Sequence, residues 1–170
     1  MNRSFRYQSA LMLLFFWLVG LATAQDAQPS LTVVGPGKTL TLSAKDWAAL
    51  PKATLKATNP HDKTTSTYSG VLLRDLLHQV GVPTGEAMRG KELANCVRLT
   101  ASDGYVAVFA LAELEPSIRD EDVLVADSVD GKPLGGSRGP LQLIVPGDKR
   151  PARWIRMLTR VEVVSMKQQP

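Results

Sequence analysis

The sequence predicts a β-rich α+β domain, in which many short strands pack against one or two helices. Short runs rich in β-branched residues recur along the chain and are separated by Gly, Pro, Asn and Asp. One segment, residues 69–81, has the apolar periodicity of a good amphipathic helix. Residues 25–170 are enough for one domain with a substantial core and too few for two ordinary ones.

Residues 1–24 have the features of a secretory signal peptide. Arg3 and Arg6 precede an apolar segment at 10–21, and residues 22–24 supply the small side chains of a cleavage site. The apolar segment is too short for a comfortable membrane span, so we expect no stable span after cleavage. The two arginines are not adjacent, which indicates general secretory export to the bacterial periplasm rather than twin-Arg export. An uncleaved N-terminal anchor is the alternative.

Beyond the signal peptide we expect a flexible leader at 25–30, the domain at 31–165 and a polar tail at 166–170. The formal net charge of the whole chain is +4, and it falls to +2 without the two signal arginines. This balance predicts no general affinity for nucleic acid or membranes. Cys96 is the only cysteine, so the chain cannot form an intramolecular disulfide.

The first predicted elements are a hairpin and a short helix. Residues 31–34 and 39–42 are β-rich and flank a Gly-Pro-Gly turn. Ser43 and Asp46 have the spacing of a capping box, which opens a helical turn that Pro51 ends.

A strand, a loop and the strongest helix follow. Residues 54–58 predict a strand, and the polar residues 59–67 predict an exposed loop. Ser69 is placed to cap the helix, Gly81 to end it in a left-handed conformation, and Pro83 prevents its continuation. The apolar stripe of this helix comprises Leu72, Leu73, Leu76, Leu77 and Val80.

The second half of the domain contains a further hairpin and three more strands. Residues 97–100 and 106–109 alternate in polarity around a Ser-Asp-Gly turn. The other predicted elements are a helical turn at 112–114, an acidic loop at 120–122, strands at 123–129, 141–145 and 161–164, a tight turn at 130–131 and a helical turn at 153–158.

A basic cluster surrounds the two Gly/Pro turns that flank strand 141–145. Guanidinium groups suit phosphate and carboxylate oxygens, so the cluster predicts a site for a small anion. A solvated basic face beside the acidic loop is the alternative. The cations are Arg138, Lys149, Arg150, Arg153 and Arg156.

Two further side chains join Arg138, Lys149, Arg150 and Arg153 as candidate ligand contacts. Tyr105 is either an aromatic at the rim of the pocket or an ordinary core residue. His61 lies beside Asp62 in a polar loop, where it either contacts a ligand or is solvated. One His and one Asp do not make a metal site, so we predict no metal centre.

Four ordered blocks of the chain resemble the sulfite oxidase-type molybdopterin-binding domain family. The blocks are Tyr68–Leu77 with Gly81-Val82, Ser102–Tyr105, Asp130–Leu134 with Gly139–Gly147, and Arg153–Ile155 with Val161–Val163. The resemblance covers roughly residues 31–164 and implies a mixed α/β domain. In active members such a domain binds a molybdenum–pterin cofactor for oxygen-atom transfer. The resemblance implies that the basic loop after strand 141–145 would form the phosphate side of the cofactor pocket.

The chain departs from this family at the metal ligand. Active members have a cysteine just upstream of the Gly-Val helix, whereas residues 57–67 contain none, and Cys96 lies after the helix. A thiolate is the soft ligand that such a metal centre needs. The missing twin-Arg pair also departs from the export of proteins folded around the cofactor. We therefore expect no resident cofactor, although the resemblance allows molybdopterin.

These observations lead to three functional hypotheses. The first is a secreted domain that binds a small anionic ligand, or a membrane sensor or redox partner protein, without molybdenum catalysis and without binding nucleic acid. The second is a molybdopterin-dependent oxidoreductase that acts alone or as a subunit. The third is an interaction module that binds no small ligand.

Overall fold

The computed structural model describes residues 30–166. The predicted signal peptide, nearly all of the leader and most of the tail lie outside these residues. The strands are β1 (Leu31–Val34), β2 (Thr39–Leu42), β3 (Ala53–Thr58), β4 (Thr65–Leu72), β5 (Asn95–Ala101), β6 (Val106–Ala110), β7 (Leu124–Val129), β8 (Lys132–Pro133), β9 (Gln142–Ile144) and β10 (Leu158–Ser165). The helices are α1 (Ala44–Ala49), α2 (Leu73–Gln79) and the short 3-10 helices η1 (Gly85–Ala87), η2 (Gly90–Ala94), η3 (Leu111–Leu114) and η4 (Pro151–Arg153).

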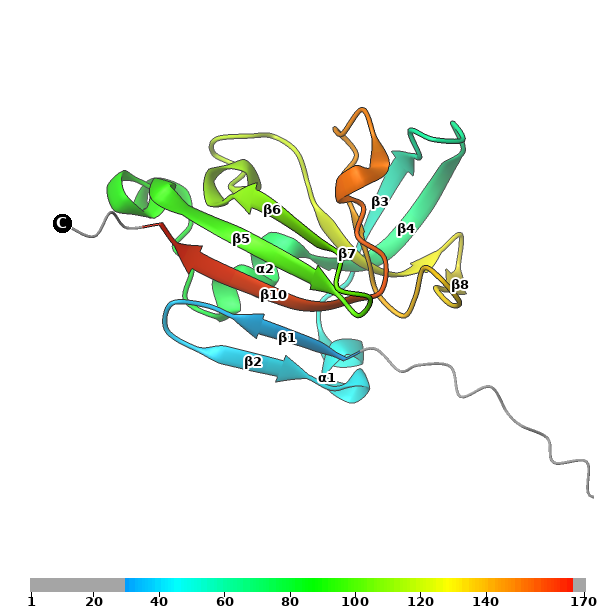
Figure 1. Cartoon of the computed structure of the whole chain (residues 1–170), viewed down its shortest axis with the longest axis horizontal. Helices are drawn as coiled ribbons and strands as arrows, with labels where there is room; N and C mark the ends of the chain where they lie inside the picture. Colours follow the sequence, from blue (N-terminus) through cyan, green and yellow to red (C-terminus); the bar gives the residue numbers. More distant parts are fainter. Residues whose placement is uncertain (1–29, 167–170) are drawn as a thin grey trace, which may run out of the picture.

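The strands form two sheets, which confirms the predicted β-rich α+β class (Figure 1). Sheet A has the order β2-β1-β10-β5-β6, and sheet B has the order β3-β4-β7-β8 with β9 also paired to β7. In sheet A, β1 and β10 are parallel, so the two ends of the domain lie side by side. In sheet B, hairpin β3–β4 extends beyond the rest of the sheet (Figure 1).

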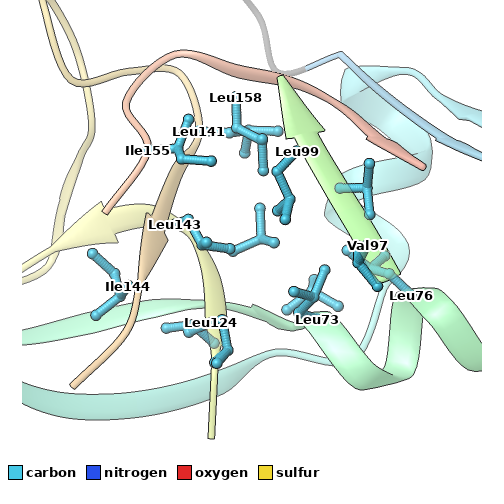
Figure 2. Close-up of a cluster of buried hydrophobic side chains, with 14 of the residues drawn as sticks. Leu73, Leu76, Val97, Leu99, Leu124, Leu141, Leu143, Ile144, Ile155 and Leu158 are labelled. Carbon is cyan, nitrogen blue, oxygen red and sulfur yellow. The ribbon is translucent and has the colours of Figure 1, made fainter. Parts of the chain in front are cut away.

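The hydrophobic core lies between the sheets and includes the inner side of α2 (Figure 2). Leu99 of β5, Leu76 of α2 and Leu143 of β9 are 0% exposed and face this space. Successive residues of a strand point to opposite faces. Because Leu143 points into the core, its neighbour Gln142 points to the other face of sheet B.

Helix α1 begins with the predicted capping box. The backbone N–H of Asp46 donates to Ser43 Oγ at 3.3 Å, and the backbone N–H of Ser43 donates to Asp46 Oδ2 at 2.9 Å. Trp47 is buried and donates its Nε1–H to Asp127 Oδ2 at 2.8 Å, while Lys52 Nζ lies 2.7 Å from the same oxygen. These contacts attach α1 to β7 of sheet B.

The predicted start of the main helix was wrong. Ser69 does not cap it, because residues 69–72 belong to β4 and α2 begins at Leu73 with no side-chain cap. The competing interaction is strand pairing, in which Gly70 and Val71 face Ala126 and Val125 of β7. The predicted loop 59–67 is shorter for the same reason, since β4 already begins at residue 65.

The predicted end of the helix is confirmed. Gly81 has φ of +91°, its N–H donates to His78 O, and the N–H of Val82 donates to Leu77 O, both at 3.1 Å. These two bonds form a Schellman motif, and glycine adopts the required left-handed conformation without steric cost.

The predicted helical turn at 153–158 was also wrong. The single turn η4 ends at Arg153, and Pro151 occupies its first position, where the missing N–H costs nothing. The chain then runs beside β9: Leu143 N–H donates to Ile155 O at 2.8 Å, and Leu158 N–H donates to Leu141 O at 2.9 Å. The backbone groups of residues 155–158 therefore form hydrogen bonds with residues 141–143 instead of hydrogen bonds within a helix.

Candidate functional site

A polar pocket of about 400 Å³ lies where the β3–β4 loop, β9 and the segment around η4 meet. The orange segment after β9 lies next to the β3–β4 hairpin in Figure 1, and both contribute to the lining. The volume is within the range of small-molecule sites. The lining residues are Asn59, His61, Tyr68, Arg138, Gln142, Pro151, Trp154 and Arg156.

Tyr68 and Trp154 supply buried aromatic surface to this pocket. Their ring centroids lie 5.9 Å apart with an interplanar angle of 89°, a favourable edge-to-face arrangement. Trp154 Nε1 donates to Val145 O at 2.7 Å, which fixes its ring. Burial raises the pKa of Tyr68 above its ordinary value, although the nearby Arg138 opposes the shift. The Tyr68 hydroxyl is therefore neutral at physiological pH and available as a hydrogen-bond donor.

Gln142 is the buried polar side chain of the pocket. It is 6% exposed and pairs across the sheet with Ala126 of β7, whose small side chain lies on the same face. No atom of the described residues donates a hydrogen bond to Gln142 Oε1. Buried polar side-chain atoms in folded proteins are nearly always hydrogen-bonded, so this amide is a candidate ligand contact.

Two arginines supply positive charge to the lining. Arg138 is half-buried and Arg156 is exposed, and neither forms an ion pair within the described residues. The segments that carry them are joined, because Met157 N–H donates to Arg138 O at 3.2 Å. An anion in the pocket would therefore meet guanidinium groups that are not already neutralised.

The β3–β4 loop is shaped by the side chains of Asn59 and Asp62. Asn59 Oδ1 accepts from His61 N–H at 2.9 Å, and Asp62 Oδ1 accepts from Thr64 N–H at 2.9 Å. The Thr64 hydrogen bond lowers the pKa of Asp62, despite the smaller opposing effect of desolvation. These turns place the exposed imidazole of His61 in the pocket lining.

Arg153 lies outside the pocket lining and contacts protein groups instead. Its guanidinium bonds to Asp148 through Nε at 2.9 Å and Nη2 at 2.6 Å, and Nη1 lies 3.1 Å from Glu113 Oε2. It also stacks over the Phe109 ring, with Cζ 4.2 Å from the centroid. The hydrogen bonds that Arg153 donates to Asp148 raise the pKa of Arg153. A ligand-binding role for Arg153 stays a prediction.

The other three basic or aromatic candidates have different positions. Lys149 and Arg150 are exposed next to the pocket residue Pro151, without lining the pocket themselves. Tyr105 is 50% exposed, and its hydroxyl donates to Ala152 O at 2.8 Å. The structure thus brings Arg138 and His61 together in one pocket and leaves the others around or outside it.

Three lining residues, Asn59, Tyr68 and Gln142, are not among the candidate contacts predicted from the sequence. Gln142 lies in a run of apolar residues, where only strand register shows which face it occupies. The polar Asn59 was visible as a turn former before Pro60, but its place in the pocket depends on the β3–β4 pairing.

Metal ligands are not grouped in the part of the chain that the structure describes. No cluster of three or more His, Cys, Asp or Glu side chains with suitable geometry occurs within residues 30–166. Cys96 is half-buried in β5, paired with Ala110 and Val164, and does not line the pocket. Within the same residues, no helix has the length and apolar character that a membrane crossing needs.

Comparison with known proteins gives one family and one fold. The family model described as "Oxidoreductase molybdopterin binding domain" matches residues 23–170. Among solved structures, the chain is similar to the sulfane dehydrogenase SoxCD from Paracoccus pantotrophus, with a TM-score of 0.63 and 19% identity. The match covers 80% of this chain and 38% of that one. No curated protein sequence matches the chain.

Proposed function

The chain belongs to the oxidoreductase molybdopterin-binding domain family, and from this premise we propose that its pocket binds a small anionic ligand without molybdenum redox catalysis. One observation carries the proposal. The pocket lining contains two arginines without carboxylate partners among the described residues, Arg138 and Arg156, but no thiolate.

The residues fit only part of the family's cofactor. The guanidinium groups suit a phosphate, and the amide of Gln142 and the hydroxyl of Tyr68 offer hydrogen bonds to a polar ring. The residues do not fit the metal of the cofactor. The β3–β4 loop contributes Asn59 and His61 to the lining, whereas the resemblance to the family implies a cysteine there. Neither side chain supplies the soft sulfur ligand. We therefore assign no catalytic step to a metal here.

We also propose a cellular compartment and a partner protein for the domain. The signal-like residues 1–24 support export to the periplasm. There the domain would report occupancy of its pocket to a membrane sensor or redox partner protein. The exposed Lys149 and Arg150 beside the pocket give such a partner a charged surface close to the ligand.

A thermal-shift screen against small anions tests the binding proposal. A ligand that binds only the folded protein stabilises it by RT ln(1 + [L]/Kd), about 2.7 kcal/mol at a hundredfold excess over Kd. We expect at least one of phosphate, sulfate and short carboxylates to raise the Tm. Arg138→Gln together with Arg156→Gln should remove most of that rise.

Arg150→Gln is the matched control, because Arg150 is an exposed cation that does not line the pocket. It should leave the anion-dependent rise in Tm intact. The binding proposal fails if no anion shifts the Tm, or if the Arg138/Arg156 double variant responds to anions as the unaltered protein does.

A molybdopterin-dependent oxidoreductase, acting alone or as a subunit, is the second candidate function. Family membership and the position of His61 in the pocket lining favour it. In that case His61 would be the ligand that takes the place of the cysteine, and His61→Ala should abolish metal retention. Unchanged metal content in this variant would count against the second function.

A further inference from the structure

Gln142 lies at the buried end of the lining, in a position unlike those of the two arginines. Its side chain is 6% exposed, whereas Arg138 is half-buried and Arg156 exposed. It projects from β9 on the face opposite Leu143, so it belongs to the pocket and not to the core between the sheets.

The amide oxygen of Gln142 lacks a hydrogen-bond donor among the described residues. This oxygen, Oε1, is buried, whereas Nε2 is not one of the buried atoms there that lack a partner. The last torsion of a glutamine is broad and nearly two-fold, so either amide atom can turn toward the pocket. A buried oxygen without a donor destabilises the free protein, and a ligand that supplies the donor would remove this cost.

The other polar groups of the lining indicate which ligand groups the pocket can bind. Arg138 and Arg156 only donate hydrogen bonds, and the Tyr68 hydroxyl can donate one to an anion. These groups all satisfy ligand oxygens that accept hydrogen bonds. Oε1 of Gln142 is a buried acceptor without a donor among the described residues, and a ligand N–H or O–H would satisfy it.

We infer that Gln142 selects anions that carry their own hydrogen-bond donor, such as hydroxy or amino acids and protonated oxyanions. This inference rests on the proposed anion binding and specifies the ligand class. The pocket volume of about 400 Å³ leaves space for roughly twenty non-hydrogen atoms at protein packing density. The donor and the anionic group therefore fit within one small molecule.

The ligand-free stability of Gln142→Met gives the first test. Methionine has a similar length and no polar group, so it removes the buried amide while it keeps the volume. We expect the Tm of Gln142→Met to equal or exceed that of the unaltered protein. A clear fall in Tm would show that the amide is satisfied within the protein, and would overturn the inference. Gln142→Leu serves as a second variant with the same expectation.

Calorimetric titration with matched probes gives the second test. Phosphate and sulfate differ by a hydroxyl donor at neutral pH, and malate and succinate differ by one hydroxyl. In the unaltered protein, the donor-bearing probe of at least one pair should bind about tenfold tighter or more. In Gln142→Met this preference should fall below about twofold, with binding of the donor-free probe retained.

The possible results separate the two proposals. Anion binding without any preference, or a preference that persists in Gln142→Met, overturns the role of Gln142 and leaves the anion site standing. Absence of binding for all four probes, together with no Tm shift from any anion, removes both.

Discussion

The guanidinium of Arg153 holds the carboxylate of Asp148 through two hydrogen bonds, of 2.9 Å from Nε and 2.6 Å from Nη2. Asp148 is only 14% exposed in its side chain, and Glu113 receives a third bond from the same guanidinium. This cluster joins the turn after β9 to η3 and stacks on Phe109 of β6. A cation within the basic loop thus stabilises the loop that frames the pocket.

Replacement of this cation should cost stability rather than affinity. Arg153→Met leaves Asp148 without its ion-pair partner and Glu113 with Arg119 alone, so we expect a loss of about 1–3 kcal/mol in the free energy of unfolding. Urea denaturation measures it, and the exposed Arg150→Met should change the same quantity by less than about 0.5 kcal/mol. Unchanged stability in Arg153→Met, combined with lost anion binding, would instead make Arg153 a ligand contact.

Asp127 should make stability depend on pH in the acidic range. Burial opposes its ionisation, but the hydrogen bonds from Lys52 and Trp47 together prevail and lower its pKa below its ordinary value. A depressed pKa contributes stability that is present above the unfolded pKa and lost as pH falls through the folded value. Asp127→Asn should therefore be destabilised at neutral pH, with a smaller difference from the unaltered protein at about pH 2.5.

Urea unfolding at the two pH values measures this difference for Asp127. The same loss in Asp127→Asn at both pH values would contradict the assignment, because a protonated Asp127 no longer accepts the Lys52 ion pair. Asp75→Asn is the control, since Asp75 has a side chain that is 52% exposed.

Gly70 permits the close approach of β4 and β7. A Cβ at this position would lie 2.0 Å from Val125 O and 2.6 Å from Ala126 Cα, both backbone atoms that cannot yield without moving β7. Gly70→Ala should destabilise the domain by about 3 kcal/mol or more, or prevent folding. Gly135→Ala is the control, because no atom lies within 4 Å of its Cβ position. Equal Tm values for the two variants would refute the close packing.

Cys96 should have no part in ligand binding. It lies in β5 between Ala110 and Val164, outside the pocket lining. Cys96→Ala should leave the anion-dependent Tm rise unchanged. A variant that lost this response, or that lost bound metal, would show that the cysteine acts at the site despite its position in sheet A.

Local signals in the sequence were sufficient for most element ends. The Ser43–Asp46 capping box, the left-handed Gly81 and the turn at Gly104 were predicted because each depends on residues close together in the chain. The start of α2 could not be predicted in the same way. Ser69 is a good helix cap locally, but the pairing of β4 with β7, some sixty residues away, makes it part of a strand.

The same distinction applies to the candidate site. Charge and turn composition led to Arg138 and His61, which the structure places in one pocket. The sequence could not show that Arg153 is neutralised by Glu113, which lies forty residues before it. Nor could it show that Gln142 faces the pocket, because that depends on strand register.

The metal content of the protein decides whether its pocket works without molybdenum. Elemental analysis of the full chain, purified from cells that make it and that also synthesise molybdenum cofactor, measures molybdenum per chain. Because the pocket lining offers arginines and an amide but no thiolate, we expect far less than one molybdenum per chain. One molybdenum per chain, lost on substitution of a pocket residue, would contradict this expectation.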